Sequence, residues 1–332
     1  MSVINPDNKK MLLSCDGGGI RGLIAVRCLE KLERIEGKPC NEIFQLMAGT
    51  STGAIIVAGL AMGIPASKLA ELYILKGKEI FHKTPNLLTR WLKWTYSKDG
   101  VRKLFKDTYG DKLLRELPVD ILIIAQDTVE CETIYFQKKK FGKMLLREAV
   151  ESSMSAPTYF QPNGSFVDGG IGSFNNPCYQ AAVEALHYLN YPRSQTALVS
   201  FGTGRWINSL RDGEAEKKNK IWWIKYVIGE GMDDANDLQV QLVRREYVKR
   251  GDLSFKRYQI SFTGEALSQI GIQMNSIPDP RAYEMDAVKY TSDLNLIANK
   301  FADYITFEEP EGVELGTRPS LNERKFMQFL RS

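Results

Sequence analysis

The stretch IFQLMAGTSTGAIIVAGLAM, residues 43–62, passes from an apolar run through a glycine turn into a second apolar run. The first run, 43–48, has the length and composition of a buried strand. The second run, 54–62, fits a buried helix, which the following Gly63-Ile64-Pro65 ends. The turn at 49–53 therefore joins a strand directly to a helix, as in α/β proteins.

The segments on either side repeat this alternation. Upstream, an apolar run at 11–14 meets three glycines at 17–19, and apolar residues at helical spacing follow over 23–35. Further strands are predicted at 119–125, 133–137, 165–167, 196–201 and near 258–262. Strands alternating with helices indicate the α/β class, with a mostly parallel sheet and right-handed crossovers.

The composition excludes several classes of protein. The chain has 332 residues and a net charge of +4, which is too weak to indicate a nucleic-acid partner. Its 43% hydrophobic and 25% charged residues are typical of globular proteins, not of coiled coils or disordered chains. Two histidines and five scattered cysteines offer little for a metal site or a disulfide framework. We therefore expect a protein without a metal or other cofactor.

The sequence also carries an expectation about location. The first 19 residues lack the basic stretch, apolar core and cleavage site of a secretory signal. No window of 18 residues is apolar enough to span a bilayer. The scattered cysteines fit a reducing compartment. We expect a soluble, cytoplasmic protein.

The glycine-rich segment 17–22 allows two interpretations. It matches the dinucleotide-binding fingerprint G-x-G-x-x-G between a strand and a helix. That fingerprint requires an acidic residue at the end of the second strand, whereas this strand ends in Gly49-Thr50-Ser51. The alternative is an oxyanion hole, in which the N–H groups of Gly17, Gly18 and Gly19 point at one spot beside a helix N-terminus.

Arg21 lies within the same glycine-rich segment and also allows two interpretations. It is predicted to add positive charge to the site or to anchor the glycine loop. A salt bridge to a neighbouring carboxylate is the alternative.

The pentapeptide Gly49-Thr50-Ser51-Thr52-Gly53 has the G-x-S-x-G pattern between a strand and a helix. That context is the one a nucleophile elbow requires, because the flanking glycines permit the sharp turn that exposes the serine. Ser51 is therefore the candidate nucleophile, with Gly49 and Gly53 in support. The alternative is that Ser51 only caps the helix that follows.

A nucleophilic serine needs a base to accept its proton. His187, downstream of Ser51, falls within a helical pattern with no glycine or loop to project it, so we expect it to be structural. Asp168 follows a short extended segment and precedes Gly169-Gly170, where the backbone can approach another loop closely. Asp168 is therefore the candidate base of a Ser–Asp dyad. A plain turn is the alternative for this Asp-Gly-Gly sequence.

Four motifs now stand in order along the chain: DGGGIRG at 16–22, GTSTG at 49–53, SAPTYF at 155–160, and DGG at 168–170 followed by NNP at 175–177. In order and spacing they resemble the patatin-like phospholipase family. The resemblance covers about residues 11–205. Plant members often carry a second glycine after Gly53, where this chain has Ala54.

The resemblance implies a three-layer α/β/α fold, related to a flattened α/β-hydrolase, without a catalytic histidine. It implies calcium-independent hydrolysis of acyl esters in phospholipids, with Ser51 as nucleophile, Asp168 as base and Gly17, Gly18 and Gly19 as oxyanion hole. We expect a catalytic domain over 11–205 and a mostly helical extension over 206–332. A general carboxylesterase or thioesterase acting on soluble esters is the alternative function.

The resemblance also bears on partners and control. Stretches 87–96 and 220–226 mix aromatic residues with Lys and Arg, which suits either a membrane-facing surface or core packing. Bacterial family members of this size include antiviral effectors that cyclic oligonucleotides activate. We therefore expect a cyclic oligonucleotide activator, peripheral contact with the inner membrane and a homo-oligomer. Basic residues over 244–257 are candidate phosphate contacts, with a solvated helix face as the alternative.

Overall fold

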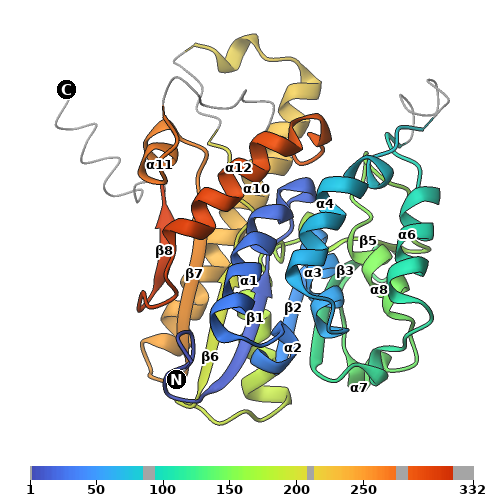
Figure 1. Cartoon of the computed structure of the whole chain (residues 1–332). Coiled ribbons are helices and arrows are strands. Elements are labelled where there is room, and N and C mark those ends of the chain that lie inside the picture. The colour runs from blue at the N-terminus through green and yellow to red at the C-terminus, as the bar shows by residue number, and fades with distance from the viewer. Residues whose placement is uncertain (1, 85–93, 208–212, 274–282, 317–332) are drawn as a thin grey trace.

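The computed structural model describes residues 2–84, 94–207, 213–273 and 283–316 (Figure 1). Eight strands of these ranges form one sheet: β1 (Lys10–Cys15), β2 (Leu46–Thr50), β3 (Asp120–Asp127), β4 (Glu132–Phe136), β5 (Phe166–Asp168), β6 (Thr196–Phe201), β7 (Ser254–Ile260) and β8 (Gly312–Leu315). Their order is β4-β3-β2-β1-β6-β7-β8, and β5 pairs with β3 off this path. Only β4 and β5 run antiparallel to their neighbour, which confirms the predicted mostly parallel sheet.

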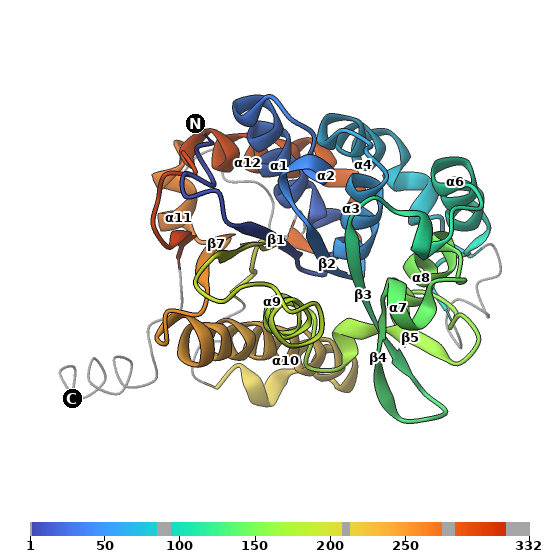
Figure 2. The same cartoon turned by 90° about the horizontal axis from the view of Figure 1, so that it is seen from below.

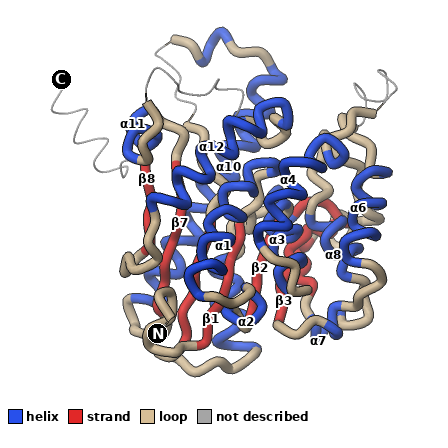
Figure 3. The backbone as a smooth tube through the Cα atoms, viewed as in Figure 1, coloured by secondary structure: helices blue, strands red, loops and turns tan. Residues whose placement is uncertain are grey.

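Helices cover both faces of the sheet. The described helices are α1 (Leu23–Glu36), α2 (Cys40–Ile43), α3 (Thr52–Ala61), α4 (Ala66–Ile80), α6 (Asp99–Tyr109), α7 (Lys138–Phe141), α8 (Leu146–Ser153), α9 (Cys178–Val183), α10 (Lys220–Val243), α11 (Gly264–Gln269) and α12 (Thr291–Tyr304). Viewed from below, α1, α3, α4 and α12 lie on one face and α9 and α10 on the other (Figure 2). The tube in Figure 3 shows the strands side by side behind the first group. The three-layer α/β/α arrangement is therefore present.

The pattern of β1 shows why both faces need helices. Met11 and Leu13 belong to the core beneath α1, α3 and α12, whereas Leu12 belongs to the second core beneath α9 and α10. Successive side chains of a strand point to opposite faces, so a continuous apolar run buries both.

The tail departs from the sequence-based expectation. The strand expected near 258–262 is β7, which begins earlier at Ser254, and β8 is not anticipated at all. Both extend the central sheet beyond β6. The division into a catalytic domain, 11–205, and an extension, 206–332, stays a prediction.

Candidate active site

The elbow at Ser51 is a strained turn. Strand β2 ends at Thr50 and helix α3 begins at Thr52, so Ser51 alone makes the change of direction between them. Ser51 accordingly takes φ 55° and ψ −121°, outside the regions that a non-glycine residue normally adopts. Its side chain forms no cap hydrogen bond with α3, which argues against the helix-cap alternative. The structure thus holds Ser51 in the conformation of a nucleophile elbow.

Neighbouring backbone atoms approach Gly49 and Gly53 so closely that neither position has room for a side chain. A Cβ on Gly49 would lie 2.3 Å from the carbonyl oxygen of Gly53, and a Cβ on Gly53 would lie 2.1 Å from that of Cys15. Backbone atoms cannot yield to such contacts. The turn therefore depends on both glycines.

We expect Gly53→Ala to lower the free energy of unfolding by about 3 kcal/mol, because the new methyl group meets the backbone at the end of β1. Urea denaturation measures the loss. Gly229→Ala is the matched control, since a Cβ at Gly229 meets nothing within 4 Å and alanine is the better helix former. A Gly53→Ala protein as stable as wild type would contradict the close packing of the elbow.

Pairing with β3 brings Asp168 to the elbow. Ile124 of β3 pairs with Thr50 of β2, and the next residue, Ala125, pairs with Asp168 of β5. Asp168, the last residue of β5, thus lies beside β3 close to where β2 ends. The Ser51 and Asp168 side chains consequently line one cavity, and the nearby Ser51 hydroxyl lowers the pKa of the Asp168 carboxylate.

Two backbone contacts fix Asp168 in turn. The N–H of Asp168 donates to the carbonyl of Ser155, 3.1 Å away. The N–H of Gly170 donates to Asp168 Oδ1 at 2.8 Å. The motifs at 155–160 and 168–170 therefore hold the carboxylate in place.

Burial changes the acidity of this carboxylate. Asp168 is 4% exposed, and its burial raises its pKa to about 6, against the opposing effect of hydrogen bonds from Ser51 and Gly170. At neutral pH the group is ionised and able to accept a proton. Its basicity is higher than that of an exposed aspartate, which suits a general base.

If Asp168 is the base, kcat/KM must fall as Asp168 becomes protonated. Protonation occurs as pH drops through about 6, so we expect an acidic limb that loses about tenfold per pH unit below that value. Hydrolysis rates from pH 4.5 to 8 test this. A rate that stays constant down to pH 4.5 would exclude a base with this pKa.

The glycine loop lies beside the dyad, but its three N–H groups differ. The N–H of Gly17 already donates to the carbonyl of Asn175, at 2.9 Å. Gly18 and Gly19 line the cavity that contains Ser51, whereas Gly17 does not. Gly19 has φ 60°, and a Cβ there would lie 2.1 Å from the carbonyl oxygen of Met285. Gly18 and Gly19 are therefore better placed than Gly17 to donate into the cavity, and an oxyanion hole at Gly17, Gly18 and Gly19 stays a prediction.

Arg21 anchors this loop. Its Nε donates to the carbonyl of Gly18 at 3.4 Å, and its Nη1 donates to that of Tyr283 at 3.3 Å. Burial lowers the pKa of the guanidinium. These contacts favour the anchoring interpretation over the salt bridge.

Several positioning residues escape the sequence analysis. Asp16 forms a buried two-point ion pair with Arg257 of β7. The hydroxyl of Thr203 donates to the carbonyl of Gly17 at 2.7 Å. The N–H of Ser51 donates to Ser153 Oγ at 2.9 Å. Their only sequence signal is a polar residue at the end of an apolar element, which is too common to single them out.

An apolar cavity of about 490 Å³ opens above the dyad. Ser51, Asp168, Gly18 and Gly19 lie in its wall, and the rest is mainly apolar, including Ile55, Tyr73, Ile80, Phe81, Met154 and Met232. Neither of the two histidines lines this cavity: His187 Nε2 lies 3.2 Å from the Tyr247 hydroxyl, and His82 lines a different cavity. The expected structural role of His187 agrees with this contact.

The mostly parallel sheet between two layers of helices places the chain in the α/β class, with a strained serine and a buried aspartate at one cavity. A family model for the patatin-like phospholipase matches residues 13–182, half of the chain. The chain therefore belongs to the patatin-like phospholipase family.

Individual relatives support this assignment. An intracellular phospholipase A2 of Caenorhabditis elegans is 31% identical over 219 residues, 59% of this chain and 20% of the relative. A calcium-independent phospholipase A2-gamma of Rattus norvegicus is 29% identical, over 60% of this chain and 29% of the relative. A cGAMP-activated phospholipase of Pseudomonas aeruginosa is 28% identical, over 48% of this chain and 52% of the relative. The chain thus spans between a fifth and about half of the relatives' lengths.

Among solved structures, VipD from Legionella pneumophila is similar, with a TM-score of 0.37 and 11% identity. The match covers 87% of this chain and 67% of that one.

Proposed function

We propose that this protein is a calcium-independent lipid acyl hydrolase of the phospholipase A type, which releases fatty acids from membrane phospholipids. The observation that carries the proposal is that the strained Ser51 and the buried Asp168 lie together in the wall of one apolar cavity. The apolar wall fits an acyl chain, and relatives of the same family are named phospholipases.

In the proposed mechanism, Asp168 accepts the proton of Ser51 as Oγ attacks the ester carbonyl. The N–H groups of Gly18 and Gly19 stabilise the negative charge that develops on the carbonyl oxygen, each contributing about 3 kcal/mol. The lysophospholipid alcohol takes the proton from Asp168 and leaves. Asp168 then deprotonates a water molecule, which attacks the acyl-enzyme; Asp168 returns the proton to Ser51 Oγ as the fatty acid is released.

The substrate class is tested by comparing long-chain phosphatidylcholine vesicles with short p-nitrophenyl esters. We expect higher kcat/KM on the phospholipid, because a long chain fills the apolar cavity and a short one does not. Equal or better use of short soluble esters would favour the alternative, a general carboxylesterase or thioesterase.

The proposal includes peripheral contact with the inner membrane from the cytoplasm. Among the described residues no helix combines the length and apolarity needed to cross a bilayer. Trp223 on α10 is 38% exposed and packs against Trp222 and Tyr226, and Lys218 lies 5.1 Å from the Trp222 ring. Aromatic rings beside lysine are typical of surfaces at the lipid headgroup level.

The other aromatic stretch, 87–96, lies largely outside the described residues. At its described end, Tyr96 is buried and packs against Phe81 and Phe160. The core-packing alternative therefore holds for Tyr96.

We expect Trp223→Glu to weaken binding to phospholipid vesicles by about tenfold, because a charge replaces an indole that would be buried among the lipids. Vesicle sedimentation measures the change. The control is hydrolysis of a soluble ester, which should keep its rate. Unchanged sedimentation would remove this surface from the proposal.

Control by a cyclic oligonucleotide, and with it an antiviral role, belongs to the same proposal. The Pseudomonas relative that is named a cGAMP-activated phospholipase supports it. Addition of cGAMP to the purified protein is expected to raise phospholipid hydrolysis, and no change across a panel of cyclic oligonucleotides would count against it. A homo-oligomer stays a prediction.

A further inference from the structure

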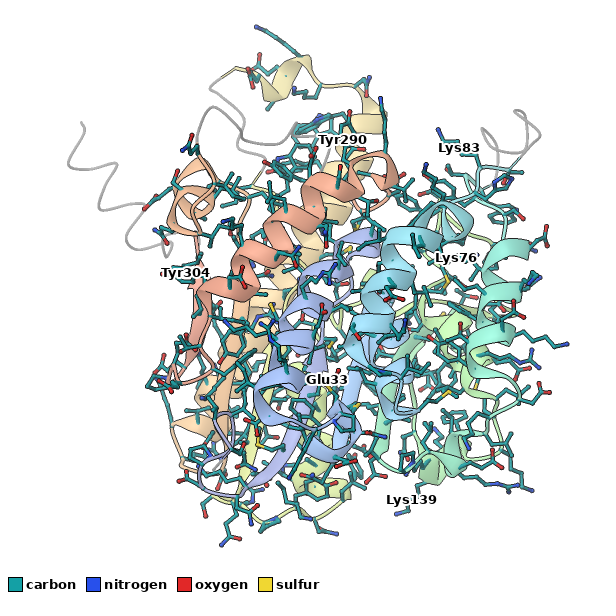
Figure 4. The ribbon with its side chains drawn as sticks, in the orientation of Figure 1. Glu33, Lys76, Lys83, Lys139, Tyr290 and Tyr304 are labelled. Carbon is teal, nitrogen blue, oxygen red and sulfur yellow. The ribbon has the colours of Figure 1, made fainter. Side chains whose placement is uncertain are left out.

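A second cavity of about 450 Å³ lies between the end of α4 and the start of α12. Lys78, His82 and Lys83 line it from one side, and Lys289, Thr291 and Ser292 from the other. Figure 4 shows Lys83 and Tyr290, which precedes α12, on separate segments in the upper part of the view. We propose that this cavity binds a phosphoryl group.

The charges of the lining favour an anion. Three lysines contribute to the wall, and no aspartate or glutamate is among the described residues that line it. Within the ranges that the structure describes, no carboxylate forms an ion pair with Lys78, Lys83 or Lys289. Ammonium groups that share a cavity wall without counter-charges repel one another, and a phosphoryl group would relieve that repulsion with charge-assisted hydrogen bonds.

Among the described residues, the arginines of the tail already form ion pairs, unlike the lysines of this cavity. Arg244 pairs with Glu314, and Arg245 and Arg250 both pair with Glu246. These guanidinium groups already have partners, so the expected phosphate contacts of 244–257 are better sought at the second cavity.

The start of α12 adds hydrogen-bond donors to the same wall. The helix has 14 residues, and its N-cap residue, Tyr290, provides no side-chain cap. The first backbone N–H groups of a helix and its dipole favour a bound anion. The acidic residue of this turn, Asp293, is not part of the cavity wall.

The cavity adjoins the catalytic one. Phe81 lines both cavities. On the α12 side, Val288 lines the basic cavity, while Met285 lines the catalytic one and accepts the N–H of Ile20 at 2.8 Å. A phosphoryl group bound here would therefore lie beside an acyl chain held above Ser51.

That position allows two sources of the phosphoryl group. It belongs either to the headgroup of a phospholipid at the membrane or to a soluble nucleotide. Either source uses the same lysines. The inference goes beyond the proposed function and does not require that the protein hydrolyse anything.

Binding is tested on the full chain with Ser51→Ala, so that lipid is not consumed. Calorimetry measures binding of inorganic phosphate and of cGAMP, and sedimentation measures binding to phosphatidylcholine vesicles with and without phosphatidic acid. Lys78→Ala and Lys289→Ala are each expected to weaken binding about tenfold. Lys68→Ala is the control, because it lies on α4 outside the cavity and pairs with Glu71; thermal unfolding verifies that each variant is folded.

Lysine-dependent binding of phosphate or cGAMP supports the proposal with a soluble ligand. Lysine-dependent binding of phosphatidic acid vesicles alone supports it with a lipid headgroup. The proposal is overturned if no probe binds, or if folded Lys78→Ala and Lys289→Ala proteins bind every probe as the Lys68→Ala control does. Because no arm measures hydrolysis, failure here leaves the proposed hydrolase activity untouched, whereas a lack of cGAMP binding also counts against activation by cGAMP.

Discussion

The Ser51→Ala variant is expected to hydrolyse phospholipid about 10⁵-fold more slowly than wild type while keeping its fold. The variant lacks the hydroxyl that we propose attacks the ester next to the Asp168 carboxylate. Asp168→Asn is expected to lose about 10⁴-fold, because an amide cannot accept the serine proton. Release of fatty acid from vesicles measures both losses.

The control for these variants is the histidine that a Ser–His–Asp mechanism would need. His187→Gln should retain wild-type activity, since His187 contacts Tyr247 and lies outside the cavity. Substantial activity in a pure, folded Ser51→Ala protein would contradict the dyad. So would a loss in His187→Gln as large as that in Asp168→Asn.

Arg257→Met is expected to lower the free energy of unfolding by about 3–5 kcal/mol. Arg257 is 2% exposed, its Nη1 lies 2.8 Å from Asp16 Oδ1, and it also donates to Ser200. The substitution leaves the Asp16 carboxylate buried without its counter-charge. Because Asp16 precedes the glycine loop, phospholipid hydrolysis should fall as well. Urea denaturation measures the first effect.

Two further variants make this prediction specific. Arg244→Met removes a more exposed ion pair with Glu314 and should cost less than about 1 kcal/mol. Adding Asp16→Asn to Arg257→Met removes the uncompensated charge, so the double variant should be more stable than Arg257→Met alone. If Arg257→Met costs no more than Arg244→Met, the buried pair does not hold the loop.

The sequence predicts best those features that a short segment determines by itself. The elbow at 49–53 requires glycine at both ends because of backbone contacts within the turn or with the adjacent strand. The run on β1 requires helices on both faces because its side chains alternate. The α/β class and the central parallel strands follow from such local patterns.

Features that depend on distant residues are harder to predict. The approach of Asp168 to Ser51 depends on adjacent pairings along β3, and the scarcity of histidine and the family resemblance indicate it only indirectly. Nothing near Arg257 shows that it pairs with a residue 241 positions earlier. The engagement of the Gly17 N–H with Asn175 likewise depends on a loop that the local sequence does not position.

The most direct test of the central claim is covalent trapping of the nucleophile. A long-chain fluorophosphonate reacts with an activated serine, and intact-mass spectrometry with peptide mapping locates the adduct. We predict a single adduct on Ser51 in the wild-type protein, slow labelling in Asp168→Asn and none in Ser51→Ala. Labelling of another residue, or equal labelling of Ser51→Ala, would contradict the assignment of Ser51 as nucleophile.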